Sequence, residues 1–220
     1  MISIIVPTLM EEKYIGKLLE SIKKQNYSDY EIIVVDAFSK DRTKDICMDY
    51  GVDFQEMFGR NTSKQRNIGA SRASGDILLF MDADVVLRNS RVLGIVSGYF
   101  NSHPEYVGGV CNVYPIPEEA SWYDNLMHFF LNKFIRVCLF LGIGAGMGAF
   151  QVVRAKKFVG YDEKKYVAED IDIIQRLKKK GKIKFFKFKV YVSLRRFKRE
   201  GYFKVMKNWI FKSRIQKVVR

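Results

Sequence analysis

The sequence predicts an α/β fold, in which a mostly parallel sheet is flanked by helices, in a single domain that ends in a basic helical extension. Short apolar runs rich in β-branched residues alternate with segments of helical periodicity in the first half of the chain. Each run ends at Pro or Asp, as expected where strand ends carry a site. The chain has 220 residues, 48% of them hydrophobic, which is enough for one sizeable core.

The first half is predicted to hold strands and helices in alternation. Continuous apolar runs predict buried strands over residues 2–6, 31–35 and 77–81, and a weaker run predicts one over 52–57. Apolar residues at helical spacing predict helices over residues 11–25, 41–50 and 62–73. Ser39 or Asp41 is the expected cap of the second helix. Strands that alternate with helices in this way imply a parallel sheet.

The second half has a looser pattern. Helices are expected over residues 92–100, 122–141 and 169–180, and strands over residues 107–113, 148–153 and 183–192. Residues 201–220 read as a basic amphipathic helix. The uncharged run over residues 137–150 is shorter than the ~20 residues that cross a bilayer, so a membrane span is not expected.

Charge is concentrated at the carboxyl end of the chain. The net charge is +14, and residues 176–220 hold 18 of the 38 Lys and Arg residues but a single acidic residue, Glu200. Such a segment suits an anionic partner: a membrane surface, a nucleic acid or a phosphorylated substrate. The three cysteines and two histidines lack the spacing of a disulfide framework or a zinc site. No secretory signal opens the sequence, so a cytoplasmic location is expected.

Two carboxylates one residue apart follow the predicted strand over residues 77–81. At a strand end, Asp82 and Asp84 can converge on one hard divalent cation, Mn²⁺ or Mg²⁺, that bridges phosphates. Such a cation neutralises charge on a departing diphosphate. Taken alone, the pair is equally typical of a solvated turn after a strand.

Several segments together resemble glycosyltransferase family 2, whose members are inverting enzymes with the GT-A fold, a Rossmann-like sheet flanked by helices. The matching segments are residues 4–8 (IIVPT), 32–36 (IIVVD), 66–70 (RNIGA), 75–84 (GDILLFMDAD), 148–150 (GAF) and 169–172 (EDID). The resemblance covers roughly residues 2–200. It implies a domain over residues 1–200, with a nucleotide-binding half over about 1–110 and an acceptor-side half over about 111–200. It implies a nucleotide-sugar donor, UDP- or GDP-linked.

The resemblance also implies roles for residues in the nucleotide-binding half. Pro7, Thr8 and Glu11 are expected to line the base and ribose, and Asp36 to hydrogen-bond the nucleobase. Arg66 is expected to help hold the nucleotide. The segment Asp82-Ala83-Asp84 is expected to contact the donor, with Asp82 and Asp84 flanking the metal and diphosphate.

The pair Glu169-Asp170 matches the acidic pair of the family, in which one carboxylate acts as general base. Of the two, Asp170 is favoured as the base. A base is needed because a sugar hydroxyl is a poor nucleophile until a positioned carboxylate helps remove its proton. A purely structural alternative stays open for this pair, since acidic residues stabilise the first turn of a helix.

Other structural alternatives also stay open. Glu11 also suits the first turn of a helix, Asp36 suits a turn, and Arg66 suits a surface salt bridge. The sequence departs from the family pattern in two places: Met10 replaces the usual Asn, and Ala37-Phe38 replace the usual Asp-Gly. These departures put the identity of the nucleobase in doubt more than the reaction.

Basic and aromatic segments in the second half point to the acceptor side. Arg195-Arg196 resemble an arginine-bearing segment of some family members, and Arg196 is the predicted phosphate ligand, with plain surface charge as the alternative. The aromatic helix over residues 122–141 suits either core packing or an interfacial position at lipid. With the basic end of the chain, it favours a lipid-linked acceptor and peripheral contact with the inner face of the cell membrane.

Other functions fit the sequence less well. A nucleic-acid-binding protein acting through the basic end would need a DNA or RNA module, and none is recognisable, so no nucleic-acid partner is expected. A nucleotidyltransferase would normally carry a glycine-rich basic loop after the first strand, but residues 7–12 contain neither Gly nor Lys or Arg. A catalytically silent scaffold of the same family is a further alternative.

Overall fold

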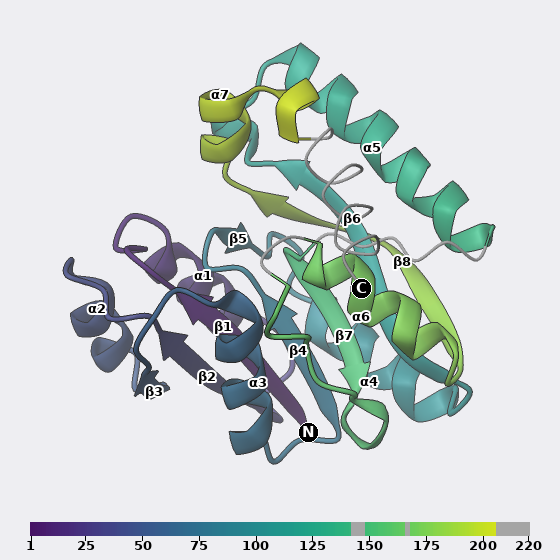
Figure 1. The fold of residues 1–220 in the computed structure, drawn as a ribbon, viewed down its shortest axis with the longest axis horizontal. Helices are drawn as coiled ribbons and strands as arrows, with labels where there is room; N and C mark the ends of the chain where they lie inside the picture. Colours follow the sequence, from purple (N-terminus) through teal and green to yellow (C-terminus); the bar gives the residue numbers. More distant parts are fainter. Residues whose placement is uncertain (142–147, 166–167, 206–220) are drawn as a thin grey trace.

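One curled sheet of eight strands organises the protein, in the order β3-β2-β1-β4-β7-β6-β8-β5 (Figure 1). The computed structural model describes residues 1–141, 148–165 and 168–205. The strands are β1 (Ile2–Thr8), β2 (Tyr30–Asp36), β3 (Asp53–Glu56), β4 (Ile77–Met81), β5 (Val85–Val86), β6 (Tyr106–Pro115), β7 (Phe150–Arg154) and β8 (Lys182–Val192).

Helices cover both faces of this sheet. They are α1 (Ile15–Lys23), α2 (Thr43–Asp49), α3 (Thr62–Arg72), α4 (Val92–Ser102), α5 (Trp122–Phe140), α6 (Glu169–Lys178) and α7 (Arg195–Glu200). Residues of α1, α2, α4 and α5 pack in one core cluster against one face, whereas α3 and α6 pack against the other. The apolar strands are buried on both sides, as their continuous hydrophobic sequence predicts.

The parallel half of the sheet confirms the predicted fold class. Strand β1 pairs in parallel with β2 and with β4, and β2 pairs in parallel with β3. In this register Thr8 lies beside Asp36, and the carboxyl end of β4 lies at the same edge of the sheet. The ends that carry the predicted site are therefore neighbours in space.

Strand β7 runs antiparallel between β4 and β6, which the sequence did not predict. Because of this direction, the start of β7 meets the end of β4, and Phe150 pairs with Met81. Gly148, two residues before Phe150, is thereby brought to the carboxylates that follow β4. The antiparallel strand closes the site from the side opposite to β1.

Element boundaries follow the predictions with a few shifts. Helix α1 begins at Ile15 rather than at residue 11. Helix α2 has Arg42 at its N-cap position without a side-chain cap, although Asp41 Oδ1 accepts a hydrogen bond from the Thr43 N–H. Strand β5 and helix α7 were not predicted. The predicted helix over residues 201–220 lies outside the described residues from 206 onward, and the predicted boundary at residue 200 stays a prediction.

A glycine in α3 sets how closely this helix approaches β1. A Cβ atom added to Gly69 would lie 2.4 Å from Cγ2 of Ile5, whose side chain is fully buried in β1. No side chain larger than hydrogen fits this contact without moving the helix.

In the part of the chain that the structure describes, no helix is both long and apolar enough to cross a bilayer.

We expect Gly69→Ala to lower the free energy of unfolding by about 1–3 kcal/mol, because the added methyl group overpacks the contact between α3 and β1. Gly94→Ala in α4 is the matched control, since a Cβ there meets nothing within 4 Å. The control should stabilise the protein by up to about 1 kcal/mol through helix propensity. Urea denaturation measures both effects, and equal shifts in the two variants would contradict the close approach.

Candidate active site

Helix α3 is tied to the ends of two strands by a buried amide. Gln65 Nε2 donates to the carbonyl oxygens of Thr8 at 2.8 Å and Val35 at 2.7 Å. Both carbonyl groups lie at the carboxyl ends of parallel strands. The amide therefore fixes the helix directly above the edge of the sheet where ligands bind in such folds.

Asn67 ties α3 to the segment before α6. Asn67 Nδ2 donates to the Tyr161 carbonyl at 2.9 Å, and Asn67 Oδ1 accepts from the Tyr161 N–H at 2.7 Å. This reciprocal pair holds the segment before α6 against α3. Arg66 lies between these two anchors, so its direction is fixed from both sides.

Arg66 is a buried cation between two carboxylates. Its side chain is 2% exposed, with Nη1 at 3.0 Å from Glu169 Oε1 and Nη2 at 2.9 Å from Asp82 Oδ1. The Tyr161 ring centroid lies 5.1 Å from its guanidinium carbon. Burial opposes its charge, but Tyr161 and the nearby carboxylates outweigh that effect and raise the pKa of Arg66. The structural alternative, that Arg66 makes a surface salt bridge, is therefore wrong, because its guanidinium is buried.

Asp170 lies beside this ion pair at the start of α6. Burial, and then the negative charge of Glu169, raise the pKa of Asp170 well above its ordinary value, although Arg66 opposes them. Its Oδ1 accepts a hydrogen bond from the Ile171 N–H at 2.9 Å. Ala168, just before the helix, adopts a positive φ of 62°, a strained conformation for a residue with a side chain. Glu169 and Asp170 do occupy a helix first turn, as their structural alternative predicted, and they also face the cavity described below.

Asp84 pairs with a second cation. Arg195 Nε lies 3.3 Å from Asp84 Oδ2. Burial and then the charge of Asp82 raise the pKa of Asp84 to about 7, against the opposing effect of Arg195. A carboxylate whose pKa is raised by burial and by a neighbouring carboxylate is a place where an added cation is favourable.

The same arginine reaches the segment after β1. Arg195 Nη1 donates to Glu11 Oε2 at 2.7 Å, and Nη2 donates to Glu11 Oε1 at 2.5 Å, a bidentate pair. Burial raises the pKa of Glu11, and Arg195 partly offsets this. Because α1 begins only at Ile15, the alternative that Glu11 belongs to a helix first turn is wrong.

A single cavity of about 790 Å³ contains most of the predicted site residues. Those that line it are Pro7, Thr8, Glu11, Arg66, Asp82, Ala83, Asp84, Glu169, Asp170 and Arg196. Its size is in the range of small-molecule sites. Residues of β1, α3 and α6 and of the segments after β4 and β8 therefore converge as predicted, although they are up to about 190 positions apart in the sequence.

Asp36 is the exception. Its carboxylate is fully buried and accepts hydrogen bonds from Thr8 Oγ1 at 2.8 Å and from the N–H of Ser39 at 2.6 Å. It is absent from the residues that line the cavity. The structure therefore places it behind Thr8, and its predicted contact with the nucleobase stays a prediction.

The two departures from the family pattern adopt unusual backbone conformations. Met10 has a φ of 59° and Phe38 a φ of 61°, in the left-handed region that Asn and Gly adopt more easily. Phe38 stacks on Phe58 with ring centroids 4.2 Å apart. The N–H of Met10 donates to Ser39 Oγ at 2.8 Å, so the two loops interlock. The backbone shape at both positions is one that the usual residues would favour.

Four cations at the cavity were missed as individual site residues: Arg60, Lys165, Arg195 and Arg199. The sequence indicates only the pair Arg195-Arg196, and it predicts Arg196 as the phosphate ligand. In the structure both line the cavity, and Arg195 makes the contacts to Glu11 and Asp84. Adjacent residues at the start of a helix point in different directions, so sequence alone could not separate them.

Asp82 and Asp84 are the residues that fit a divalent cation. Among the described residues no group of three or more His, Cys, Asp or Glu side chains is placed to hold a metal. Mg²⁺ in nucleotide sites commonly takes one or two carboxylates and completes its shell with phosphate oxygens and water. Asp82 and Asp84 follow β4 and line a cavity that Arg and Lys side chains also line, so they supply the two carboxylates that such a site takes.

The sheet and its helices form a fold of the GT-A type, which solved glycosyltransferases share. PcManGT, a mannosyltransferase from Pyrobaculum calidifontis in complex with GDP-Man and Mn²⁺, matches with a TM-score of 0.69 at 18% identity, over 88% of this chain and 56% of that chain. Staphylococcus aureus TarS 1–349 in complex with UDP matches with a TM-score of 0.67 at 20% identity, over 87% of this chain and 60% of that chain. At such identity the likeness shows the fold.

Sequence comparison gives the family. The family model described as Glycosyl transferase family 2 matches residues 3–160, and the protein belongs to this family. Poly(ribitol-phosphate) beta-N-acetylglucosaminyltransferase TarS from Staphylococcus aureus Mu50 is 34% identical over 109 residues, 46% of this chain and 19% of that protein. The 4,4'-diaponeurosporenoate glycosyltransferase of Staphylococcus haemolyticus is 34% identical over 137 residues, 59% of this chain and 36% of that protein. The chain thus spans well under half the length of these relatives.

We expect Asp170→Asn to weaken the pH dependence of stability. The folded state raises the pKa of Asp170, so its contribution to stability is present in acid and is lost as the pH rises through that folded-state pKa. Between about pH 5 and about pH 8, the free energy of unfolding of the wild type should fall by about 1–3 kcal/mol more than that of the variant. Urea denaturation in metal-free buffer measures the difference. Parallel curves would show that burial does not hold the proton on Asp170.

Proposed function

We propose that this protein is an inverting, metal-dependent glycosyltransferase that moves a sugar from a nucleotide-sugar donor to an acceptor hydroxyl or phosphate. The observation that carries this proposal is the convergence of two acidic pairs, Asp82 with Asp84 and Glu169 with Asp170, in one cavity that arginines also line. Membership of glycosyltransferase family 2 supports the class of reaction and weighs against a nucleotidyltransferase.

The donor is proposed to lie across the ends of β1 and β4. Pro7 and Thr8 border the cavity beside β1 and would face the base and ribose, while Asp82 and Asp84 border it after β4 and would face the diphosphate. Arginines of the same cavity, Arg196 among them, suit phosphate oxygens. One solved neighbour was determined with UDP and another with GDP-Man, so the experiment below tests both UDP and GDP.

Asp82 and Asp84 are proposed to hold Mn²⁺ or Mg²⁺. When bound, the cation neutralises negative charge on the departing diphosphate. Support comes from the raised pKa of Asp84, because a carboxylate destabilised by burial and then by a neighbouring carboxylate is stabilised by an added cation. PcManGT was solved with Mn²⁺.

Asp170 is proposed to be the general base. The Glu169 carboxylate pairs with Arg66, whereas the Asp170 carboxylate accepts a hydrogen bond, among the described residues, only from the backbone N–H of Ile171. The raised pKa of Asp170 makes it a stronger proton acceptor near neutral pH than an ordinary carboxylate. It would accept the proton of the acceptor hydroxyl while that oxygen attacks the anomeric carbon from the side opposite the diphosphate. One such displacement inverts the configuration.

The acceptor is proposed to be lipid-linked, such as a polyprenyl phosphate or a lipid-linked glycan. Arg196 and Arg199 line the cavity at α7, the helix that also packs against α5 through Phe197. Cations at this side suit a phosphate-bearing acceptor. The cytoplasmic location expected from the sequence stays a prediction.

We expect one nucleotide, UDP or GDP, and its sugar conjugates to bind only with Mn²⁺ present, and Asp84→Ala to abolish that binding. The carboxylate is needed because diphosphate and cavity acids repel each other without the cation. Isothermal titration measures both. Asp76→Ala is the matched control, an exposed acid at the opposite end of β4. Failure of every nucleotide to bind to the folded wild type with Mn²⁺ would overturn the proposed function.

We expect Asp170→Asn to lower kcat by about 100-fold or more, because it removes the proton acceptor. Glu169→Gln removes the partner of Arg66 but leaves the proposed base, so it should retain most of the turnover. Single-turnover rates with the donor identified by titration measure both. Loss of turnover in Glu169→Gln with activity retained in Asp170→Asn would transfer the role to Glu169.

A further inference from the structure

Helix α5 exposes an apolar face where a surface helix normally exposes a polar one. Its inner side packs into the core through Leu131, Ile135 and Cys138. Its outer side carries large apolar side chains whose exposed fractions run from 42% for Leu126 to 89% for Phe140. We call this stripe the α5 outer face; it consists of Trp122, Leu126, Phe130, Phe134, Val137 and Phe140. These residues recur three or four positions apart, so they form one continuous stripe.

A helix that carries an apolar stripe on its outer side as well as on its inner side is usually covered on both sides. Helix α5 has 19 residues, so the outer face extends over about 28 Å along the rim of the molecule, beyond β6 (Figure 1). A patch of this length is larger than scattered surface hydrophobics explain, and it marks an interaction surface. The open question is which partner fits it.

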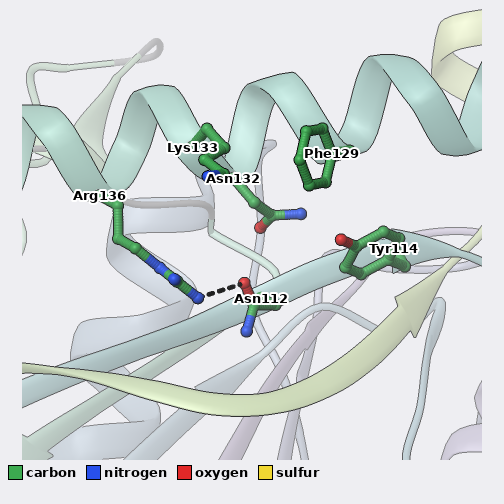
Figure 2. Close-up of a pocket in the computed structure, with 6 residues that line it drawn as sticks. All are labelled: Asn112, Tyr114, Phe129, Asn132, Lys133 and Arg136. Atoms are coloured by element: carbon green, nitrogen blue, oxygen red, sulfur yellow. Dashed lines mark hydrogen bonds between the residues drawn. The ribbon is translucent and has the colours of Figure 1, made fainter.

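Two exposed cations of α5 lie beside its outer face. Lys133 and Arg136 are exposed on the same helix and line a small cavity of about 70 Å³ between α5 and β6. Figure 2 shows Arg136 reaching from α5 to Asn112 on β6, with Nη2 at 3.2 Å from Asn112 Oδ1. The only acidic residue of α5 is Asp124, which caps the helix with Ser121 and accepts a hydrogen bond from Tyr202. No acidic side chain therefore lies on the outer face itself.

More cations flank the first turns of α5. The Phe197 ring of α7 packs on His128 of α5 with centroids 5.1 Å apart, and the Tyr202 ring stacks on Phe197 at 4.6 Å. These contacts place α7, with exposed Lys198 and Arg199, beside the amino end of α5. Phe203, 81% exposed, adds a further aromatic ring in the same region.

We propose that the α5 outer face docks the protein on an anionic lipid surface, with the helix lying in the plane of the membrane. The aromatic and aliphatic side chains enter the boundary between headgroups and acyl chains, and the cations beside them pair with anionic headgroups. Exposed aromatic rings, flanking Lys and Arg, and the absence of acids from the face are the features that adapt a helix to this interface. The proposal does not depend on the proposed transfer reaction.

Docking in this way also orients the active site. Phe197 packs on α5 and lines the large cavity at the same time. Arg195, two residues earlier, binds Glu11 inside that cavity. Helix α7 therefore links the proposed membrane-facing helix to the cavity within a few residues.

The test is cosedimentation of the full chain with phosphatidylcholine vesicles and with vesicles of phosphatidylcholine and phosphatidylglycerol. We expect binding to the anionic vesicles, lowered about tenfold or more by the double variant Phe130→Ser and Phe134→Ser. The matched control removes two exposed apolar side chains elsewhere, Phe58→Ser and Met48→Ser, 80% and 60% exposed, and should bind as the wild type does. Lys133→Gln and Arg136→Gln should each lower binding to anionic vesicles about fivefold.

Several outcomes would overturn the proposal. Wild-type binding to neither vesicle is one, and unchanged binding of the Phe130 and Phe134 variant is another. If that variant binds normally and about 0.5 M salt abolishes binding, basic residues alone hold the protein. If vesicles do not bind and light scattering shows a dimer that the variant loses, the face meets a second copy instead. Circular dichroism without vesicles checks that each variant is folded, so failure here leaves the proposed function untouched.

Discussion

The buried guanidinium of Arg66 is the constraint on which the site depends. Asp82 follows β4 with a side chain that is 40% exposed, whereas Glu169 begins α6 with a side chain that is 17% exposed. Without a cation between them, such a cluster would be strongly unfavourable. Arg66 contacts both carboxylates at 3.0 Å or less, and its own direction is fixed because Gln65 and Asn67 anchor the same turn of α3. One turn of α3 thus contacts the ends of β1 and β2 through Gln65. Through Arg66 it also contacts Asp82 of the proposed metal pair and Glu169 of α6.

A second arginine extends this arrangement across the chain. Arg195 binds Glu11 and Asp84, so it ties the segment after β8 to the segments after β1 and β4. Each acid of the proposed metal pair therefore has one protein cation as a partner. The raised pKa of Asp84 shows that this compensation is incomplete. Because the negative charge of this pair is only partly compensated, binding of a divalent cation together with a diphosphate would be favourable there.

The two faces of α5 connect this chemistry to the surface of the molecule. The inner face is ordinary core, whereas the outer face is apolar, edged by cations and devoid of acids. Phe197 of the short helix α7 contacts α5 and also lines the cavity, so this helix connects the α5 outer face with the cavity. The proposed docking and the proposed transfer are separate properties that share this structural link.

The sequence by itself determined the alternating α/β pattern, the parallel strands β1, β2 and β4, and the residues at their ends. It did so because hydrophobic period and strand-ending residues are local properties of the chain. Tertiary structure decided what depends on partners distant in sequence: the antiparallel β7, the burial of Arg66, and the choice of Arg195 as the ligand of Glu11. It also turned Asp36 away from the cavity, because Thr8 and Ser39 supply its hydrogen bonds. A sequence pattern states which side chains are apolar or charged, but pairing and side-chain direction follow only from the folded backbone.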